Sequence, residues 1–229
     1  MKFLAIVPAR SGSKEVPNKN LILFKKKRIT NIAIDIGLSI KEIKKVIIST
    51  DSKKILAFAK KYGNKIMKIK RKKKLSEDKT PMLPVLKDAL IKFEKKYEEK
   101  VDAMIILDPT SPLRQRKDIK RGIKIFKKKK VDLLLSCHKS TVSPYFSLFE
   151  KKGKFYQLSK GKNLNIGSRQ ESPPVYAANT VVWIYSRRSI LNHKIRIPRK
   201  TKIIVIENNK TLEINSQIDR LLLRKIKSR

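Results

Sequence analysis

Two kinds of hydrophobic repeat alternate along the first part of the chain. Continuous apolar runs predict strands that are buried on both faces, as in a parallel sheet. Apolar residues at helical spacing lie between these runs and predict helices. The predicted strands are residues 3–7, 46–50, 65–69, 103–107 and 131–136, and the predicted helices are residues 29–40, 51–61, 84–99 and 118–128. The first helix could be capped by Thr30 or Asn31, and the second by Asp51 or Ser52.

The pattern changes after about residue 140. Residues 145–149 and 155–158 predict a β-hairpin around Gly153, and apolar strands return at 181–185 and 203–206. A terminal helix is expected to pack its apolar face against the core. That face would consist of Ile214, Ile218, Leu221, Leu222 and Ile226.

This order predicts an α/β protein with an open, mostly parallel, Rossmann-like sheet flanked by helices. The 229 residues fit one domain, 1–229, with an insertion at about residues 140–175. The insertion could hold a lid or a partner surface.

The composition is strongly basic. Fifty-eight Lys and Arg against 19 Asp and Glu give a net charge of +39, and this excess is typical of proteins that bind nucleic acids or anionic membranes. Most of the excess is lysine, however, and it is spread over predicted turns and helix ends. Bidentate readout would favour arginine instead. We therefore do not expect a nucleic-acid partner.

One cysteine, Cys137, excludes a disulfide framework and a multi-cysteine zinc site, which suits the reducing cytoplasm. No apolar run approaches the roughly 20 residues of a membrane span, and the N-terminal apolar stretch is too short for a signal peptide. We expect a cytoplasmic protein without a membrane partner.

Candidate chemistry lies beyond the carboxyl ends of the predicted strands, where open α/β sheets bind ligands. After the first strand, small residues and a serine could close around phosphate groups, with Arg10, Lys14 and Lys19 supplying positive charge. The loop is neither a Walker A loop nor a dinucleotide-binding fingerprint. From these residues alone, it could be a phosphate site or an ordinary turn.

Five motifs in order resemble the acylneuraminate cytidylyltransferases, the CMP-sialic acid synthetase family. The first and most specific is Ile6-Val7-Pro8-Ala9-Arg10-Ser11-Gly12-Ser13-Lys14-Glu15-Val16-Pro17-Asn18-Lys19-Asn20-Leu21. The others are Ser49-Thr50-Asp51, Asp78-Lys79-Thr80-Pro81-Met82, Leu107-Asp108-Pro109-Thr110-Ser111-Pro112-Leu113-Arg114, and Arg169-Gln170 with Tyr176-Ala177-Ala178-Asn179. The resemblance covers nearly the whole chain.

The resemblance implies transfer of CMP from CTP to the anomeric hydroxyl of a nine-carbon α-keto sugar acid, with release of pyrophosphate. It implies Mg²⁺ as cofactor and a homodimer in which the insertion packs onto the partner subunit and helps close its site. Arg10 and Lys19 would be catalytic. The nucleotide would contact Ala9, Arg10, Ser13, Lys19, Asn20, Asp78 and Thr80, and the sugar would contact Asp108, Ser111, Arg169 and Asn179. Fixed cations and a metal suit charge that builds up on phosphate oxygens.

The sequence departs from the family's pattern at two places. The metal segment usually reads Asp-Ile-Asp with a later acid, whereas this chain has Glu213, Asn215 and Asp219. The side-chain oxygens of Glu213 and Asn215 could still reach one ion. Alternatively, these two residues end a surface strand, and Asp219 lies in the first turn of the last helix, where the helix dipole favours an acid. An arginine common two residues before Asn179 is also missing, which opens the choice of sugar to sialic, legionaminic or pseudaminic types.

Two other functions stay open at this point. One is a CMP-Kdo synthetase or another sugar nucleotidyltransferase, which shares the fold. The other is a catalytically weakened, basic relative that binds nucleic acid, because of the Glu213 and Asn215 changes and the charge of +39. Cys137 and His138 are adjacent in an extended segment and point to opposite faces, so they are not expected to form a nucleophile pair. Trp183 is expected in the core.

Overall fold

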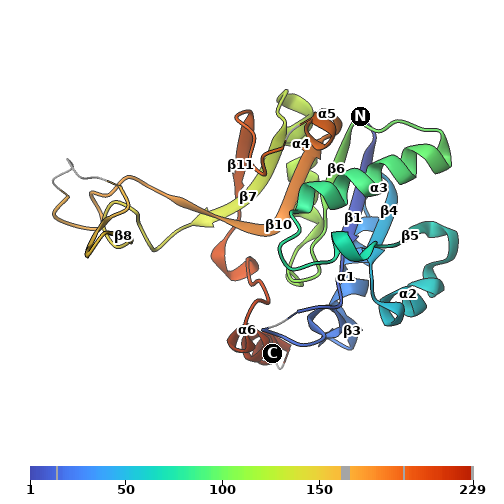
Figure 1. The fold of residues 1–229 in the computed structure, drawn as a ribbon, viewed down its shortest axis with the longest axis horizontal. Coiled ribbons are helices and arrows are strands. Elements are labelled where there is room, and N and C mark those ends of the chain that lie inside the picture. Colours follow the sequence, from blue (N-terminus) through green and yellow to red (C-terminus); the bar gives the residue numbers. More distant parts are fainter. Residues whose placement is uncertain (14, 161–165, 193, 228–229) are drawn as a thin grey trace.

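The computed structural model describes residues 1–13, 15–160, 166–192 and 194–227. Lys14 and part of the predicted insertion therefore lie outside the described residues. Seven strands form one sheet in the order β11-β7-β10-β6-β1-β4-β5 (Figure 1). They are β1 (Phe3–Pro8), β4 (Ile43–Thr50), β5 (Ile66–Lys70), β6 (Ala103–Ile106), β7 (Leu133–Lys139), β10 (Tyr176–Ser186) and β11 (Thr201–Val205).

The sheet is mostly parallel, as predicted. β1 pairs in parallel with β4 and β6, β4 with β5, and β11 with β7. β10 is antiparallel to both of its neighbours, β6 and β7. The sequence did not indicate this reversal, since β10 is as apolar as the parallel strands beside it.

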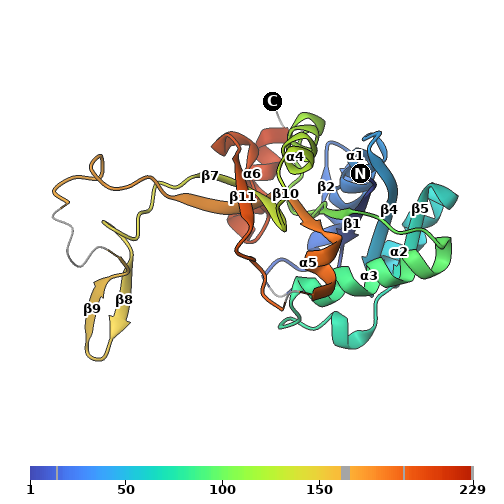
Figure 2. The same ribbon diagram turned by 90° about the horizontal axis from the view of Figure 1, so that it is seen from above.

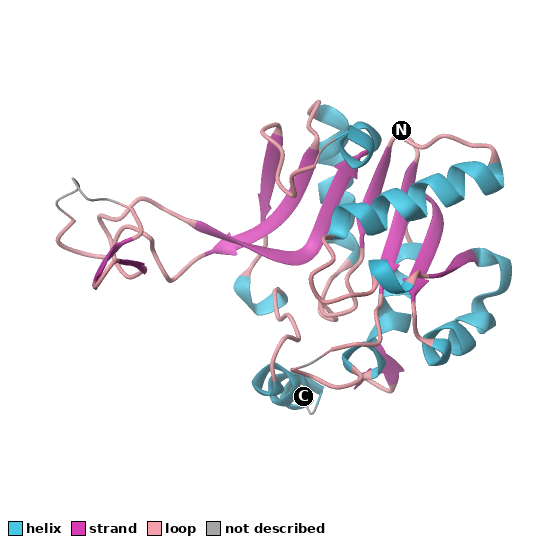
Figure 3. Cartoon of the chain, viewed as in Figure 1, coloured by secondary structure: helices cyan, strands magenta, loops and turns pink. Residues whose placement is uncertain are grey.

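Helices cover both faces of the sheet (Figures 2 and 3). They are α1 (Ile29–Leu38), α2 (Lys53–Ala59), α3 (Met82–Tyr97), α4 (Arg116–Lys128), α5 (Arg187–Asn192) and α6 (Gln217–Lys227). Short 3-10 segments lie at Lys19–Leu21, Lys60–Lys65, Lys73–Leu75 and Asn208–Lys210. Alternate residues of β1 enter two cores: Phe3, Ala5 and Val7 pack with α1 and α4, and Leu4 and Ile6 pack with α3 and α5. The predicted Rossmann-like architecture is confirmed.

The predicted hairpin is present. β8 (Phe149–Lys152) and β9 (Phe155–Leu158) pair in antiparallel fashion, and Gly153 between them has a φ of 64°, a left-handed conformation that glycine adopts without strain. The first strand begins four residues later than predicted. The segment that carries the hairpin projects from the body of the molecule between β7 and β10 (Figure 1).

One of the two capping predictions was wrong. α1 is preceded by Arg28 rather than capped by Thr30 or Asn31, because the hydroxyl of Thr30 is buried and donates to the carbonyl of Asn20. The other was confirmed for Ser52, which caps α2, since its side chain accepts from the amide of Ile55.

The predicted apolar face of the terminal helix is not packed on the core. Ile214, which precedes α6, is buried, but Ile218, Leu221, Leu222 and Ile226 are exposed and Leu223 is buried instead. Leu223 packs with Phe24 of the short strand β2 (Leu23–Phe24), which pairs with β3 (Lys27–Arg28). α6 therefore rests on a two-stranded ribbon, which offers too little surface to cover more than one side of the helix.

No helix among the described residues combines the length and the apolar character needed to cross a membrane.

Candidate active site

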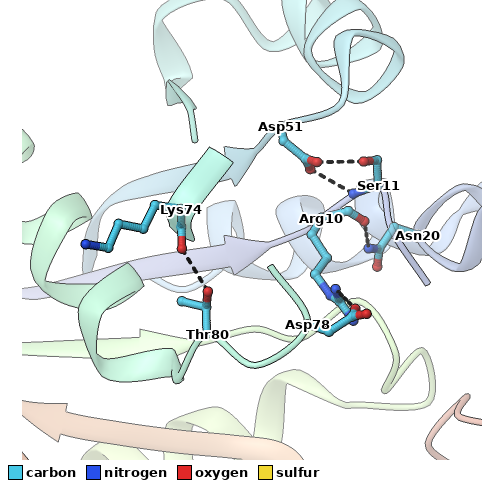
Figure 4. Close-up of polar contacts among 7 residues, drawn as sticks. All are labelled: Arg10, Ser11, Asn20, Asp51, Lys74, Asp78 and Thr80. Atoms are coloured by element: carbon cyan, nitrogen blue, oxygen red, sulfur yellow. Dashed lines mark hydrogen bonds and ion pairs between the residues drawn. The ribbon is translucent and has the colours of Figure 1, made fainter. Parts of the chain in front are cut away.

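The loops beyond the carboxyl ends of β1 and β4 meet at one edge of the sheet (Figure 4). The amide and the hydroxyl of Ser11 donate to the two carboxylate oxygens of Asp51, over 2.8 and 2.6 Å. Arg10 forms an ion pair with Asp78 from the loop after β5. The loop after β1 is therefore anchored to both neighbouring loops.

Asn20 holds the far end of the same loop. Its side-chain amide donates to the carbonyl of Arg10 over 2.9 Å, and the side chain is buried. Asn18, two residues before it, adopts a φ of 55°, which Asn tolerates better than most residues. These contacts hold the two ends of the loop after β1 together.

A cavity of about 490 Å³ opens beside this loop. It brings together four residues predicted to bind the nucleotide, Arg10, Ser13, Lys19 and Asp78, with Asn215 from the predicted metal segment. Two cations and a serine on one wall provide donors for phosphate oxygens. We call this space the phosphate cavity.

Three predicted nucleotide residues have structural partners. Ala9 is buried and its amide donates to the carbonyl of Ser49. The hydroxyl of Thr80 donates to the carbonyl of Lys74 over 2.9 Å (Figure 4). Asn20 makes the loop contact described above. These residues shape the loops, and their contact with a nucleotide stays a prediction.

The predicted metal residues lie beside the phosphate cavity. The ammonium of Lys19 donates to the side-chain oxygen of Asn215 over 3.3 Å. Glu213 has a hydrogen bond with Thr180, and burial raises the pKa of its carboxyl, which the nearby Asp108 carboxylate raises further. Two carboxylates that share a poorly hydrated site favour a cation between them. Glu213 and Asp108 carry the carboxylate oxygens that hard cations prefer, and binding of a metal by Glu213, Asn215 or Asp219 stays a prediction.

Asp219 has a different arrangement. One of its carboxylate oxygens accepts from the amides of Asn215 and Ser216, over 2.9 and 2.7 Å, and from the Ser216 hydroxyl. This is the arrangement of an acid at a helix N-terminus. Among the residues that the structure describes, no three His, Cys, Asp or Glu side chains gather around one point where they could hold a metal ion.

The predicted sugar residues are divided between two parts of the molecule. Asp108 accepts from the amide and hydroxyl of Thr110, and Ser111 shares a hydrogen bond of 2.6 Å with the hydroxyl of Thr180. Asn179 is buried, its side-chain oxygen accepts from the hydroxyl of Ser136, and its side-chain nitrogen has no partner among the described residues. Arg169 is exposed and belongs to the insertion, and it lines neither the phosphate cavity nor the larger one described next.

A larger cavity, of about 680 Å³, lies between α3, β10 and α5. Asp108 and Thr180 line it, and Glu213 hydrogen-bonds to Thr180 and to Asn215, which lines the phosphate cavity. We call it the acceptor cavity. Its apolar walls include Leu83, Trp183, Tyr185, Ile190 and Leu191. Sequence analysis assigned Trp183 to the core, and it is only 5% exposed, yet its ring also forms a wall of this cavity.

Sequence analysis assigned no role to two buried arginines at the same edge, Arg71 and Arg114, although Arg114 ends one of the quoted motifs. Arg71 follows β5 and donates to the hydroxyl and the carbonyl of Ser49, and burial lowers its pKa. Arg114 donates to the carbonyls of Asp108, Thr180 and Val181, which ties the loop after β6 to β10. A buried arginine has no sequence signal of its own in a chain so rich in lysine.

The structure supports the dismissal of Cys137. The thiol is free and buried, and burial raises its pKa, which disfavours the reactive thiolate.

The chain is similar to known proteins. The cytidylyltransferase family model matches residues 4–209. The chain is 31% identical over 218 residues to the CMP-N,N'-diacetyllegionaminic acid synthase of Campylobacter jejuni, covering 95% of this chain and 92% of that protein. It is 30% identical over 219 residues to post-translational flagellin modification protein B of Campylobacter coli, with the same coverage.

A solved structure of a CMP-2-keto-3-deoxy-manno-octonic acid synthetase complexed with CTP has the same fold. Its TM-score is 0.70 at 13% identity, over 100% of this chain and 98% of that one. The family model covers most of the chain, and the relatives match it nearly from end to end. This chain belongs to the cytidylyltransferase family.

Proposed function

We propose that this protein transfers CMP from CTP to the anomeric hydroxyl of a nine-carbon α-keto sugar acid. One observation carries the proposal: Glu213 hydrogen-bonds both to Asn215, which lines a cationic cavity, and to Thr180, which lines a large, mostly apolar one. The first suits a triphosphate and the second an organic acceptor. The relatives named as acid synthases support the choice of acceptor class.

In the proposed reaction, the acceptor hydroxyl forms a bond to the α-phosphorus, and the bond from that phosphorus to the β-phosphate oxygen breaks. The hydroxyl proton passes to a base and pyrophosphate leaves. Negative charge grows on the phosphate oxygens, and Arg10 and Lys19 on the wall of the phosphate cavity would stabilise it. Asp78 would hold the Arg10 side chain in place until the nucleotide binds.

We propose Mg²⁺ as the cofactor, held by Glu213 and Asn215. Magnesium takes one or two protein carboxylates and completes its shell with water and substrate phosphates, so this small donor set suits it. The raised pKa of Glu213 supports a cation here, because a cation would relieve the repulsion from Asp108. When bound, the ion would supply positive charge to the triphosphate.

We also propose a homodimer formed through the insertion. Phe149, Phe155 and Tyr156 of the hairpin are 60%, 75% and 67% exposed, an unusual state for aromatic side chains on a projecting segment. Packing on a second copy of the chain would bury them. It would also bring Arg169 to the partner's acceptor, which a single chain does not achieve. The free, buried Cys137 is consistent with a cytoplasmic enzyme.

The test is pyrophosphate release from CTP with a panel of α-keto sugar acids, including N-acetylneuraminic acid, N,N'-diacetyllegionaminic acid, pseudaminic acid and the eight-carbon Kdo. We expect turnover with one or more nine-carbon acids. Arg10→Ala should lower turnover at least about 100-fold if Arg10 stabilises transition-state charge, while Arg121→Ala on the exposed side of α4 should not.

Turnover with Kdo alone would favour the rival synthetase. No turnover with any acid, together with salt-sensitive RNA binding, would contradict the proposal and favour the nucleic-acid rival.

A further inference from the structure

One side of α6 is apolar and exposed. Four side chains of this side are between 39% and 69% exposed: Ile218, Leu221, Leu222 and Ile226. Residues three or four positions apart lie on the same side of a helix, so these four form one row, which we call the α6 stripe. Leu223 points the other way and packs with Phe24 of the β2–β3 ribbon. The helix lies at the lower edge of Figure 1, below the sheet, and the stripe faces away from the ribbon.

The charged side chains beside the α6 stripe are cations. Lys225 lies four positions after Leu221 and Arg224 lies three positions after it, so both belong to the same side of the helix, and both are exposed. The one acid within Gln217–Lys227 is Asp219, whose carboxylate accepts from backbone amides at the start of the helix. The stripe is therefore accompanied by positive charge that no acid of the helix offsets.

This combination decides between the surfaces that could cover the α6 stripe. In a symmetric contact with a second copy of α6, Lys225 and Arg224 would face like charges, which is unfavourable. Nucleic acid would meet the cations through its phosphates but would leave the leucine and isoleucine side chains without an apolar partner. The surface of an anionic bilayer suits both, because its interfacial region accepts apolar side chains and its headgroups attract cations.

We propose that α6 binds the surface of a bilayer that contains anionic lipids, with the α6 stripe in the headgroup region. This contact goes beyond the proposed function. The sequence indicated no membrane partner because it has neither an apolar run long enough to span a bilayer nor a signal peptide, and a helix that lies on one face of a bilayer needs neither.

The experiment is sedimentation of the whole protein with vesicles at an ionic strength of about 0.15 M. One set of vesicles consists of phosphatidylcholine, and the other contains phosphatidylcholine and phosphatidylglycerol in roughly equal parts. Each Lys or Arg near an anionic surface favours binding by about fivefold. With Arg224 and Lys225 at the surface, we expect the protein to bind the mixed vesicles at least about 20-fold more tightly than the neutral ones.

Two pairs of variants assign this binding to α6. Ile218→Gln should weaken binding to the mixed vesicles at least about fivefold, because full burial of an isoleucine side chain is worth about tenfold or more. Its matched control is Ile91→Gln on α3, where Ile91 is 47% exposed. Lys225→Gln should weaken binding about fivefold, and its control is the exposed Lys120→Gln on α4. Both controls should change binding less than about twofold. Fluorescence of Trp183, the only tryptophan, checks that each variant is folded.

Equal binding to neutral and mixed vesicles, or binding to neither, would overturn the proposal. It would also be overturned if the controls weakened binding as much as the α6 variants, because the overall charge of +39 would then account for the attraction. A dimer that dissociates on Ile218→Gln while vesicle binding stays unchanged would show that a second copy covers the stripe, and would overturn the proposal as well.

Discussion

Arg114 is the residue whose replacement should affect both stability and the site. Its side chain is 4% exposed, and burial lowers its pKa to about 10, so the guanidinium is still charged at neutral pH. It donates to three backbone carbonyls, those of Asp108, Thr180 and Val181. These contacts join the loop that carries Asp108 and Ser111 to the strand that forms the acceptor cavity.

Arg114→Met would keep most of the side-chain volume and remove every donor. Each buried acceptor left without a partner costs about 1–3 kcal/mol. The Asp108 carbonyl keeps the amide of Ser111, so the carbonyls of Thr180 and Val181 suggest a loss of about 2–5 kcal/mol. For a chain of this length, 1 kcal/mol corresponds to about 2–4 °C, which gives a fall in Tm of about 4–20 °C. Arg114→Lys keeps one donor group and should lose less.

The assay is urea unfolding followed by the fluorescence of Trp183, whose ring N–H is bonded to the residue next to Thr180. Arg121→Met, an exposed arginine of α4, is the control and should stay within about 0.5 kcal/mol of wild type. If Arg114→Met were as stable as that control, the carbonyls of Thr180 and Val181 would have other partners and the reasoning would be wrong.

Two further predictions concern the ion pair that joins α3 to α5 and the predicted metal residue Asn215. Glu94→Gln should cost about 1 kcal/mol at neutral pH, because Arg187 binds both oxygens of Glu94 and so lowers its pKa below the ordinary 4.5. The ion pair stabilises the protein above the pKa of Glu94 in the unfolded chain, and this stabilisation is lost as the pH falls through the pKa of Glu94 in the folded protein. In urea unfolding, the difference in unfolding free energy between wild type and Glu94→Gln should therefore shrink in acid. A difference that does not change with pH would contradict the prediction. Asn215→Asp should lower the Mg²⁺ concentration needed for half-maximal thermal stabilisation about tenfold, since it adds a carboxylate; an unchanged midpoint would remove Asn215 from the metal site.

The sequence predicted the fold well because buried parallel strands have a simple pattern. A strand covered on both faces is apolar at every position, and the runs at β1, β4 and β6 are of this kind. The edge at which their loops meet follows from the parallel order. The loop with Arg10, Ser13 and Lys19 could therefore be placed at this edge, and the family resemblance added Asp78; all four residues line one cavity.

The direction of β10 and the buried side of α6 were harder to predict. β10 is antiparallel, but its apolar run looks the same in either direction. The periodicity of α6 predicted a helix but did not determine which of its sides packs against the rest of the protein. The side with Ile218 and Leu222 is exposed, because the helix packs only on the β2–β3 ribbon. The acceptor cavity was missed for a related reason: Trp183, Ile190 and Leu191 have the composition of core residues, and whether such residues meet or leave a space is decided by the packing of α3, α5 and β10.

The acidic residues mark the site better than the basic ones. With 58 basic residues in the chain, the presence of a lysine or arginine does not indicate a functional site, whereas acidic residues are rare. Four of the acids at the ligand edge have contacts there: Asp51 binds Ser11, Asp78 binds Arg10, and Asp108 lies near Glu213. Each one fixes a loop or a cation that faces the cavities. In a background this basic, the positions of the carboxylates at strand ends identify the site better than the positive charge does, because a solvated lysine costs nothing to place and a partly buried acid must have a partner.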